Sequence, residues 1–445
     1  MLICGGSGIT ISGLFECWTH LIFAAQMNSS DDSESREYGM NGLQPSRQQP
    51  VGRDEYLFLG AVAFLCLCYM FSPLASYLGA LLYLTVFSHR LSTRVRIATG
   101  VVVIISAASI WASREVGRNA SDDFEFYYDM YRRVGALEWG AERIPVYEFG
   151  LPLLFRIIRI GLPDLTPNGL MFVLTSVTGL ILLFCVERFG LTGFARGKRA
   201  YCVAMALLFF SFVLTTQLTR QMLSSAILVL AFFSLKALPR GLWVLLASVV
   251  HVSAVGVYAV VRVFQSRHLL ITMVLVSVVV GAHLIDLEAV ASLLGAYGVP
   301  RVGYYLTMGD SGANAASLDI VLVVALAGLL SILVCKAANA RVLWREKRLM
   351  ALLVGVIIVY LLSLNVILGP FRLFLVIHAV MAGWIFAFFT RRFATSYLVV
   401  GGVLLILWKA RSLYFTDPSS AFLPWGVYGP FGAVPGYFVL SYFTN

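Results

Sequence analysis

Residues 200–238 read AYCVAMALLFFSFVLTTQLTRQMLSSAILVLAFFSLKAL, and this stretch decides the fold. Its charged residues are Arg220 and Lys236, and the apolar segments on either side of Arg220 approach the length of a bilayer-spanning helix. A helix satisfies its own backbone polar groups, which lipid cannot do. The stretch therefore predicts two consecutive membrane-spanning helices.

The rest of the chain repeats this pattern. Hydrophobic residues make up 59% of the 445 residues and charged residues only 13%, whereas a soluble domain carries about 25% charged residues. We predict an all-α fold, a polytopic helical integral membrane protein of about 11–13 transmembrane helices. Residues 56–87 form one long span or two short ones around Pro73, and the other apolar runs are 97–113, 169–187, 200–219, 222–238, 241–262, 268–285, 317–335, 349–368, 371–389 and 395–414.

Two terminal segments flank this membrane domain of residues 56–414. Residues 1–55 are predicted to be a poorly ordered extension. Residues 27–55 are rich in Ser, Asp, Glu and Gln, a composition typical of disordered segments. Residues 1–26 have an apolar stretch but make a poor signal peptide, because no basic region precedes it. A translation start at Met27 or Met40 would also account for the extension. Residues 415–445 form a C-terminal tail.

The seven cysteines lie in apolar surroundings without the spacing of a zinc or redox motif.

The formal net charge of +10 comes from short basic clusters beside the spans, which favours membrane lipids over nucleic acid as the partner. Basic loops mark the cytoplasmic side. The loop 114–168 has seven arginines but nine acidic residues, so we place it on the external side together with 286–316. The cytoplasmic clusters are Arg90/Arg94/Arg96, Arg188/Arg196/Lys198/Arg199, Lys236/Arg240, Arg341/Arg345/Lys347/Arg348 and Arg391/Arg392.

This assignment leaves an odd number of spans between the clusters at 236–240 and 341–348. One resolution is that 241–262 is a broken or re-entrant hairpin that turns near His251. Each arm would then be shorter than the roughly 20 residues that a complete span needs.

The first external loop contains the pattern of a short amphipathic helix. Asn119 or Ser121 can cap it, and Asp122 and Asp123 would occupy its first turn, where the helix dipole favours acids. Helical spacing places aromatic residues on one face and acids on another. The aromatic face comprises Phe124, Tyr127, Tyr128 and Tyr131, and the acidic face Asp122, Glu125 and Asp129. Such a helix lies on the membrane surface with its rings down, or it forms a surface on which sugars stack.

Several polar residues stand inside apolar surroundings, where they are costly and indicate function. Glu148, at the point where the loop returns to the membrane, is a candidate general base or an ordinary loop acid. His251 is a second candidate base or a packing residue bonded to a hydroxyl. Arg220 and Gln221 interrupt two spans, and Arg372 follows the Gly369-Pro370 break, so both arginines are candidate phosphate ligands.

Arg114, which ends the span 97–113, is either a snorkelling anchor or a third such arginine. Together Arg114, Arg220 and Arg372 would gather beside the acidic loop. Cations for a diphosphate, carboxylates or an imidazole for a hydroxyl, and rings for sugars are the groups that lipid-linked glycosyl transfer needs. The sequence has no Gly-rich phosphate loop, DxD, HExxH or Gly-x-Ser-x-Gly motif, which argues against nucleotide-driven chemistry.

At these residues the chain resembles the EpsG-like, Wzy-type bacterial polysaccharide polymerases. The resemblance covers about 56–390. It departs from the usual spacing by inserting Asn119-Ala120-Ser121, which leaves open whether Asp122 or Asp123 is the matching acid. The matching elements are Arg114, Gly117, Asp122-Asp123-Phe124, Tyr127/Tyr128, Tyr131, the PVYEFG segment with Glu148, Arg220-Gln221, Ala247 to Ser253 around His251, Arg301 with Tyr304-Tyr305, and Arg372-Leu373.

The resemblance implies a metal-independent, cofactor-independent glycosyltransferase of the bacterial inner membrane, with its site facing the periplasm or exterior. It would polymerise undecaprenyl-diphosphate-linked oligosaccharide repeats of an O-antigen or exopolysaccharide, alongside a flippase and a chain-length regulator. Asp122, Asp123, Glu148 and His251 would be catalytic. The substrate-binding residues would be Arg114, Tyr127, Tyr128, Tyr131, Arg220, Gln221, Arg301 and Arg372.

Three other interpretations remain open. A transporter, or flippase, of lipid-linked oligosaccharide would also need arginines in a membrane cavity, although the chain shows no paired halves of the kind common in transporters. A ligase that moves the finished glycan to a lipid core is an enzymatic alternative. A structural membrane subunit would tolerate substitution of Arg220 or Arg372 without any change except in abundance.

Overall fold

The described part of the computed structural model consists of helices and the turns that connect them. It comprises residues 53–116, 123–135, 148–162, 165–234, 236–265, 311–334, 340–362, 369–414, 439 and 443, and these contain no strand. The all-α prediction is confirmed for this part of the chain. The predicted span 268–285, the loop 286–316 up to residue 310, the N-terminal extension up to residue 52 and nearly all of the C-terminal tail lie outside the described residues.

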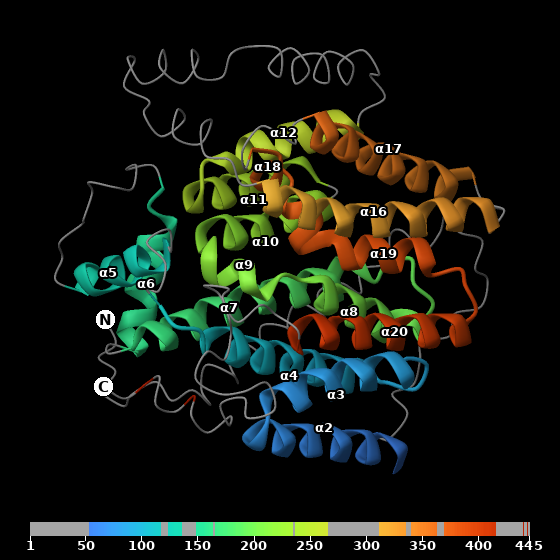
Figure 1. The fold of residues 1–445 in the computed structure, drawn as a ribbon, viewed down its shortest axis with the longest axis horizontal. Coiled ribbons are helices and arrows are strands. Elements are labelled where there is room, and N and C mark those ends of the chain that lie inside the picture. Colours follow the sequence, from blue (N-terminus) through green and yellow to red (C-terminus); the bar gives the residue numbers. More distant parts are fainter. Residues whose placement is uncertain are drawn as a thin grey trace.

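The helices stack side by side, from α2 at one edge to α17 at the other (Figure 1). Between them α3, α4, α7, α10 and α11 pack in succession, and the late helix α19 packs on α8. The bounds are α2 Arg53–Phe71, α3 Pro73–Val86, α4 Thr93–Ala112, α5 Asp123–Gly135, α6 Gly150–Gly161, α7 Pro167–Cys185, α8 Arg199–Phe209, α9 Phe212–Gln217, α10 Thr219–Phe233, α11 Ala237–Val250, α12 Ser253–Gln265, α16 Ser311–Val334, α17 Ala340–Leu362, α18 Gly369–Leu373, α19 Ala382–Thr390 and α20 Thr395–Tyr414, with π-helical turns η2 Val186–Gly190 and η4 Val376–Met381 and a 3₁₀ turn η3 Arg196–Lys198.

Two of the helix breaks agree with the sequence patterns. Pro73 starts α3, and the Ser72 side chain caps that helix by accepting a hydrogen bond from the amide of Ala75, so 56–87 forms two helices. The run 241–262 breaks at His251, which has extended dihedral angles between α11 and α12. The predicted break near His251 is therefore confirmed, and the sidedness built on it stays a prediction.

Two other breaks differ from the predicted single spans. The run 200–219 divides into α8 and α9 at Phe210, and 371–389 divides into α18, η4 and α19. These breaks are coupled, because the backbone amide of Ser211 donates to the carbonyl of Ala379 over 2.9 Å. A π-helical turn leaves carbonyl groups without their usual α-helical partners. A hydrogen bond between distant segments thus satisfies backbone groups that two continuous helices would have paired internally.

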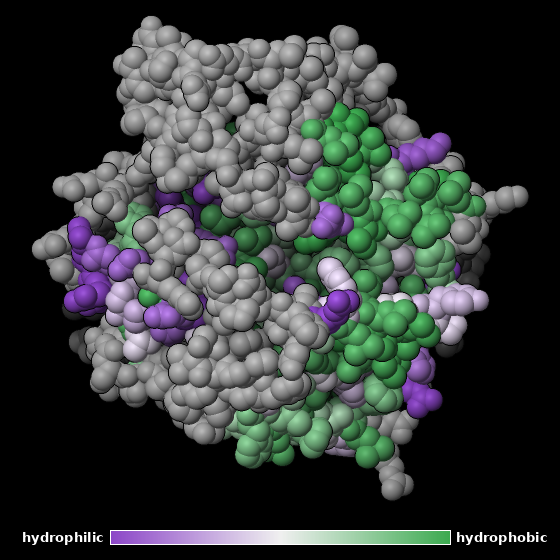
Figure 2. All heavy atoms as spheres, viewed as in Figure 1, coloured by the Kyte–Doolittle hydropathy of each residue, from purple (hydrophilic) through white to green (hydrophobic). Residues whose placement is uncertain are grey.

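The outer surface of the stack is apolar. Large hydrophobic side chains are exposed on α2, α11, α16, α17 and α20, and Figure 2 shows hydrophobic residues over α16, α17 and α20 and hydrophilic ones near α5. Soluble monomers rarely expose apolar patches of this extent. By length and composition alone, two helices among the described residues could cross a membrane, Thr93–Ala112 and Pro167–Gly190, and eight shorter apolar helices accompany them.

The short helices α5 and α6 lie at one end of the stack, where they connect α4 to α7 (Figure 1). They pack on one another, and α5 also contacts α7 and α9. The amphipathic helix predicted for the external loop is therefore present as α5. Its buried residues Phe124, Tyr127 and Tyr131 face the protein's own helices and not a membrane surface, because α6 and α9 cover that face.

Candidate functional site

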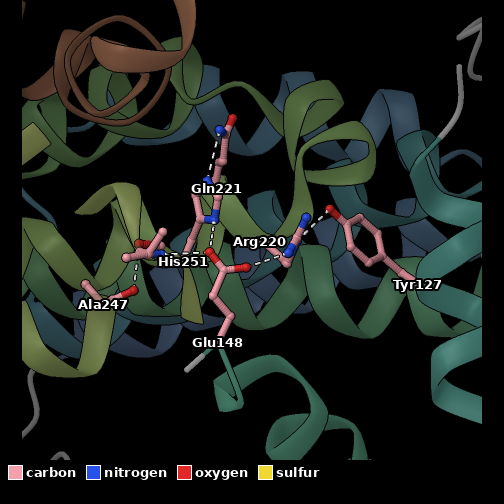
Figure 3. A network of polar contacts seen from close by, with 8 residues as sticks. Tyr127, Glu148, Arg220, Gln221, Ala247 and His251 are labelled. Atoms are coloured by element: carbon pink, nitrogen blue, oxygen red, sulfur yellow. Dashed lines mark hydrogen bonds and ion pairs between the residues drawn. The ribbon is translucent and has the colours of Figure 1, made fainter. Parts of the chain in front are cut away.

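A buried carboxylate joins three segments of the chain at this end of the stack. Glu148 is 2% exposed, and its oxygens receive hydrogen bonds from two side chains and one backbone amide. Arg220 Nη1 donates to Oε2 over 2.6 Å. His251 Nδ1 lies 2.8 Å from Oε1, and the amide of Val252 donates to the same oxygen over 2.9 Å (Figure 3).

A glycine allows Glu148 to come this close. Gly150 starts α6 two residues later, and a Cβ placed there would lie 2.9 Å from the backbone carbon and oxygen of Val249 in α11. Such a contact is shorter than real Cβ atoms make. The neighbouring residues Leu151 and Pro152 are buried, which fixes the start of α6 against α11. The missing side chain of Gly150 therefore brings the carboxylate to the break after α11.

The helix break supplies one of the donors. Because α11 ends at Val250 and α12 begins at Ser253, the amide of Val252 has no helical carbonyl to pair with and donates to Glu148 instead. An unpaired backbone amide in apolar surroundings costs several kcal/mol, of the order of 2–7. The carboxylate thus stabilises the break, and the break in turn positions His251.

Two consecutive residues in the first turn of α10 hold the Glu148–His251 pair from opposite ends. Arg220 contacts the carboxylate, and the side-chain nitrogen of Gln221 lies 3.1 Å from His251 Nε2 (Figure 3). The close packing of α10 on α11 fixes this geometry, and the hydroxyl of Ser224 donates to the carbonyl of Ala247 over 2.9 Å. The polar residues that interrupt the sequence at 220–221 therefore act as one unit.

The other side of Arg220 faces α5. Its Nε donates to the hydroxyl of Tyr127 over 3.2 Å, and its guanidinium carbon lies 5.7 Å from the ring centroid. Burial raises the pKa of Tyr127, and the charge of Asp123 adds to this, whereas Arg220 and Arg372 oppose it. Tyr127 therefore stays a neutral phenol that accepts from Arg220.

The pKa of Glu148 lies below its ordinary value of 4.5. Burial of the carboxyl acts to raise that pKa, but the hydrogen bonds from His251 and Val252 and the charge of Arg220 outweigh the burial. Glu148 is therefore ionised at neutral pH.

Arg114 is buried nearby in a separate set of contacts. It is 1% exposed, and its Nη2 donates to the carbonyl of Thr216 over 2.9 Å and its Nε to the Thr216 hydroxyl over 3.2 Å. Its guanidinium carbon lies 5.9 Å from the ring centroid of Phe124 in α5. Arg114 is therefore no snorkelling anchor, because it joins the end of α4 to α9 and α5.

Two of the three predicted arginines contact α5. Arg114 contacts Phe124, and Arg220 contacts Tyr127. The half-buried Arg372 lies in α18, and its charge acts to lower the pKa of Tyr127. The aromatic rings of Phe124 and Tyr127 lie 6.4 Å apart. The predicted gathering is thus present for Arg114 and Arg220, and for Arg372 it stays a prediction.

The remaining tyrosines of α5 are Tyr128 and Tyr131, and Tyr131 contacts α6. Tyr131 is 1% exposed, donates a hydrogen bond to the carbonyl of Leu162, and meets the ring of Phe155 edge-on at 6.0 Å. Tyr128 stacks on Tyr131 at 6.3 Å and stays partly exposed. Tyr131 therefore holds α5 on α6, and Tyr128 is the one of these two rings with surface left for a ligand.

Four predicted residues lie outside the described residues. They are the site residues Asp122 and Arg301 and the capping residues Asn119 and Ser121.

The sequence patterns predicted no role in the site for Gly150, Thr216 or Val252. Gly150 had a signal, since a glycine directly follows the Glu148-Phe149 pair where a helix begins. Thr216 and the Val252 amide had no such signal, because their roles depend on contacts between distant segments.

Among the described residues no three His, Cys, Asp or Glu side chains gather as metal ligands. The arginines of the site suit an anionic ligand.

Fold and site together define a helical membrane protein with a buried carboxylate, an imidazole and several arginines at one end of its helix stack. Comparison with family models gives a more particular assignment. The model described as the EpsG family matches residues 101–425, well over half of the chain, and the protein belongs to this family. Every described site residue falls within the match. Membership assigns the protein a polymerase-type role in polysaccharide biosynthesis. The searches of curated proteins and of solved structures return no match.

Proposed function

We propose that this protein is a membrane glycosyltransferase that polymerises undecaprenyl-diphosphate-linked oligosaccharide repeat units into a surface polysaccharide. The observation that carries the proposal is the buried Glu148 held between Arg220 and His251 in a chain of the EpsG family. Buried ionisable groups that converge from separate helices are costly to the fold. Their cost is explained if the cluster performs the transfer.

The reaction needs a cation where negative charge develops on the leaving diphosphate. Arg220 suits this role, because 17% of its side chain is exposed while the carboxylate beneath it is 3% exposed. A guanidinium binds two phosphate oxygens at once, and preorganised charges of this kind often contribute most of the stabilisation of a transition state. Arg372 is the second proposed diphosphate ligand, since its charge, like that of Arg220, acts to lower the pKa of Tyr127.

The reaction also needs groups for the acceptor sugar and its hydroxyl. Glu148, Asp122 and Asp123 are the proposed carboxylates, His251 is a further candidate base, and Tyr128 offers a partly exposed ring for a sugar face. Arg114 is better suited to hold α5 in place, because its guanidinium is already engaged with Thr216. We assign the site to the periplasmic or external face of the bacterial inner membrane.

Basic loops meet at one end of the stack, which supports this orientation. Arg96, near the start of α4, forms a two-pronged ion pair with Glu187, with N–O distances of 2.6 and 2.7 Å. Lys198 donates to the carbonyls of Arg391 and Phe393 over 2.7 and 2.8 Å, so two basic loops lie together. Arg114 follows the opposite end of α4, which the 20-residue length of that helix puts roughly 30 Å away.

A glycan ladder tests the proposal. A strain lacking its own copy is given wild type, Arg220→Ala, the double variant Asp122→Ala/Asp123→Ala, or Arg94→Ala as a control in an exposed arginine of the basic end, and membrane abundance is measured in parallel. We expect single-repeat glycan from the first two variants and a normal ladder from the control. Loss of all repeat units from the external leaflet would instead indicate the transporter.

A further inference from the structure

The structure also bears on which group takes the proton, a question that rests on the proposed function. We infer that Glu148 accepts the proton of the acceptor hydroxyl, and that it can do so only after the substrate diphosphate has drawn Arg220 away from it. His251 and Gln221 are then positioning residues, which hold the carboxylate but do not touch the reacting atoms.

Both ring nitrogens of His251 are already engaged. Nδ1 faces the ionised Glu148, which can only accept, so Nδ1 carries a hydrogen. Nε2 faces the side-chain nitrogen of Gln221, which donates into its lone pair. If the Gln221 amide were turned over, its oxygen would face Nε2, and Nε2 would have to carry a hydrogen as well. In either orientation the imidazole has no free lone pair for a substrate hydroxyl.

The two oxygens of Glu148 are held differently. Oε1 receives the two donors that belong to the helix break, from His251 and from the amide of Val252, and a carboxylate oxygen offers about two such positions. Oε2 receives Arg220 among the described contacts. Oε1 is therefore the anchored oxygen, and Oε2 is the one whose partner can be exchanged.

Arg220 is a partner that a substrate can reach. Its side chain and that of His251 are equally exposed, at 17%, but both ring nitrogens of His251 are engaged and its ring carries no fork of donors for phosphate. The hydroxyl of Tyr127 holds Arg220 Nε from the other side. A diphosphate carries more negative charge than one carboxylate and presents several oxygens to the guanidinium. On its arrival the Nη1 contact passes from Glu148 to phosphate, while the contact with Tyr127 can remain.

The transfer is balanced in atoms and electrons. The acceptor hydroxyl oxygen forms a bond to the anomeric carbon of the donor sugar, and its proton passes to Oε2 of Glu148. The bond from that carbon to the diphosphate oxygen breaks, and its electron pair leaves with the polyprenyl diphosphate, where Arg220 neutralises the added charge. When the diphosphate departs, Arg220 returns to Glu148 and the proton passes to water.

The exchange changes the basicity of Glu148 in a definite direction. The charge of Arg220 is one of the causes that lower the pKa of Glu148 in the empty site. When Arg220 gives up its contact with Glu148 and binds phosphate, the pKa of Glu148 rises and the carboxylate becomes a stronger base. Among the described residues, the other charged or titratable groups around the pair are His251 at the break, Asp123 and Tyr127 on α5, and Arg372 on α18. The donor thus activates the base that it requires.

Steady-state kinetics of the full-length protein in lipid vesicles test the assignment of the base. The probe is the pool of lipid-linked repeat units extracted from the deletion strain, and the variants are Glu148→Gln, His251→Asn and His251→Ala. Asparagine can place an amide hydrogen where Nδ1 donates, so His251→Asn keeps the donor to Oε1 but has no basic nitrogen.

We expect kcat to fall by about 10²–10⁴-fold in Glu148→Gln, the range typical of a lost general base. His251→Asn should keep kcat within about ten-fold of wild type, and His251→Ala should lose clearly more. Equal inactivity of the two His251 variants, with Glu148→Gln still active, would overturn the inference and make His251 the base. Failure of wild type to lengthen the repeat units would count against the proposed function itself.

The pH profile of wild type tests the exchange without any variant. Activity needs ionised Glu148, so it falls as the pH drops through the pKa of that group, in the free protein for kcat/KM and in the complex for kcat. We expect the acidic limb of kcat at a higher pH than that of kcat/KM, and the limb should persist in His251→Asn. Coincident limbs, or a limb that disappears in His251→Asn, would contradict the exchange.

Discussion

At the scale of single residues, Arg220 is the group that connects the buried carboxylate to α5. It links the carboxylate of Glu148 to the phenol of Tyr127, and thereby α10 to both short helices at the end of the stack. Hydrogen bonds that involve a charged group contribute about 1.5–3 kcal/mol each. The orientation of the guanidinium therefore depends on both neighbours, and each can be tested separately.

Tyr127→Phe removes the hydroxyl that accepts from Arg220 Nε but leaves the ring, which lies 5.7 Å from the guanidinium carbon. We expect the KM for the lipid-linked donor to rise by about ten-fold, a free energy of about 1.4 kcal/mol, with kcat little changed. Tyr128→Phe is the matched control, because it removes a neighbouring hydroxyl on α5 but keeps the ring that stacks on Tyr131 and is proposed to meet a sugar face. An equal effect of the two changes would show that Tyr127 does not position Arg220.

The sequence singled out several of these residues individually but could not predict their contacts. Arg220 and His251 stand in apolar runs, where a polar group is costly, and this cost is visible without a structure. The sequence around Glu148 is equally compatible with an ordinary loop acid. Its connection to the other two depends on how three separate segments pack, which no local pattern encodes.

At the scale of elements, the site depends on helices that stop. The break between α11 and α12 exposes the amide of Val252, and the start of α6 delivers Glu148 to it. The histidine in the run 241–262 made that break predictable. The break between α8 and α9 was not predictable, because it is satisfied by a hydrogen bond from Ser211 to Ala379 in a distant segment.

Gly150→Ala tests the contact that brings α6 to α11. The added methyl group would lie 2.9 Å from the backbone of Val249, so α6 must shift, and overpacking of this kind costs about 1–3 kcal/mol. We expect a lower melting temperature in detergent and a loss of polymer that exceeds the loss of folded protein. Gly161→Ala is the control at the other end of α6, where a Cβ meets nothing within 4 Å. If both variants behave like wild type, the placement of Glu148 does not depend on this contact.

At the scale of the whole molecule, the helix stack separates two kinds of polar group. The end that carries α5 and α6 holds the Glu148 cluster, whereas the other end holds the Arg96–Glu187 pair and the joined basic loops at Lys198 and Arg391. Apolar side chains cover the helices between the two ends. This separation agrees with the orientation predicted from the basic loops, in which the cluster faces outward.

Labelling from outside intact cells tests that orientation. In a background without cysteine, Arg133→Cys on α5 should react with a membrane-impermeant thiol reagent, and Arg90→Cys should react only after the cells are opened. Both positions are exposed in the structure, so a difference in labelling reports the side of the membrane and not burial. Labelling of Arg90→Cys alone in intact cells would reverse the orientation and place the cluster in the cytoplasm.

The central claim is that Glu148 performs a step of glycan polymerisation, and the most direct measurement is the length of surface glycan made with Glu148→Gln. Glu115→Gln serves as the matched control, because Glu115 is an exposed acid of the same connection between α4 and α7. At equal membrane abundance, we predict glycan of one repeat unit from Glu148→Gln and a full ladder from Glu115→Gln. A full ladder from Glu148→Gln would contradict the account.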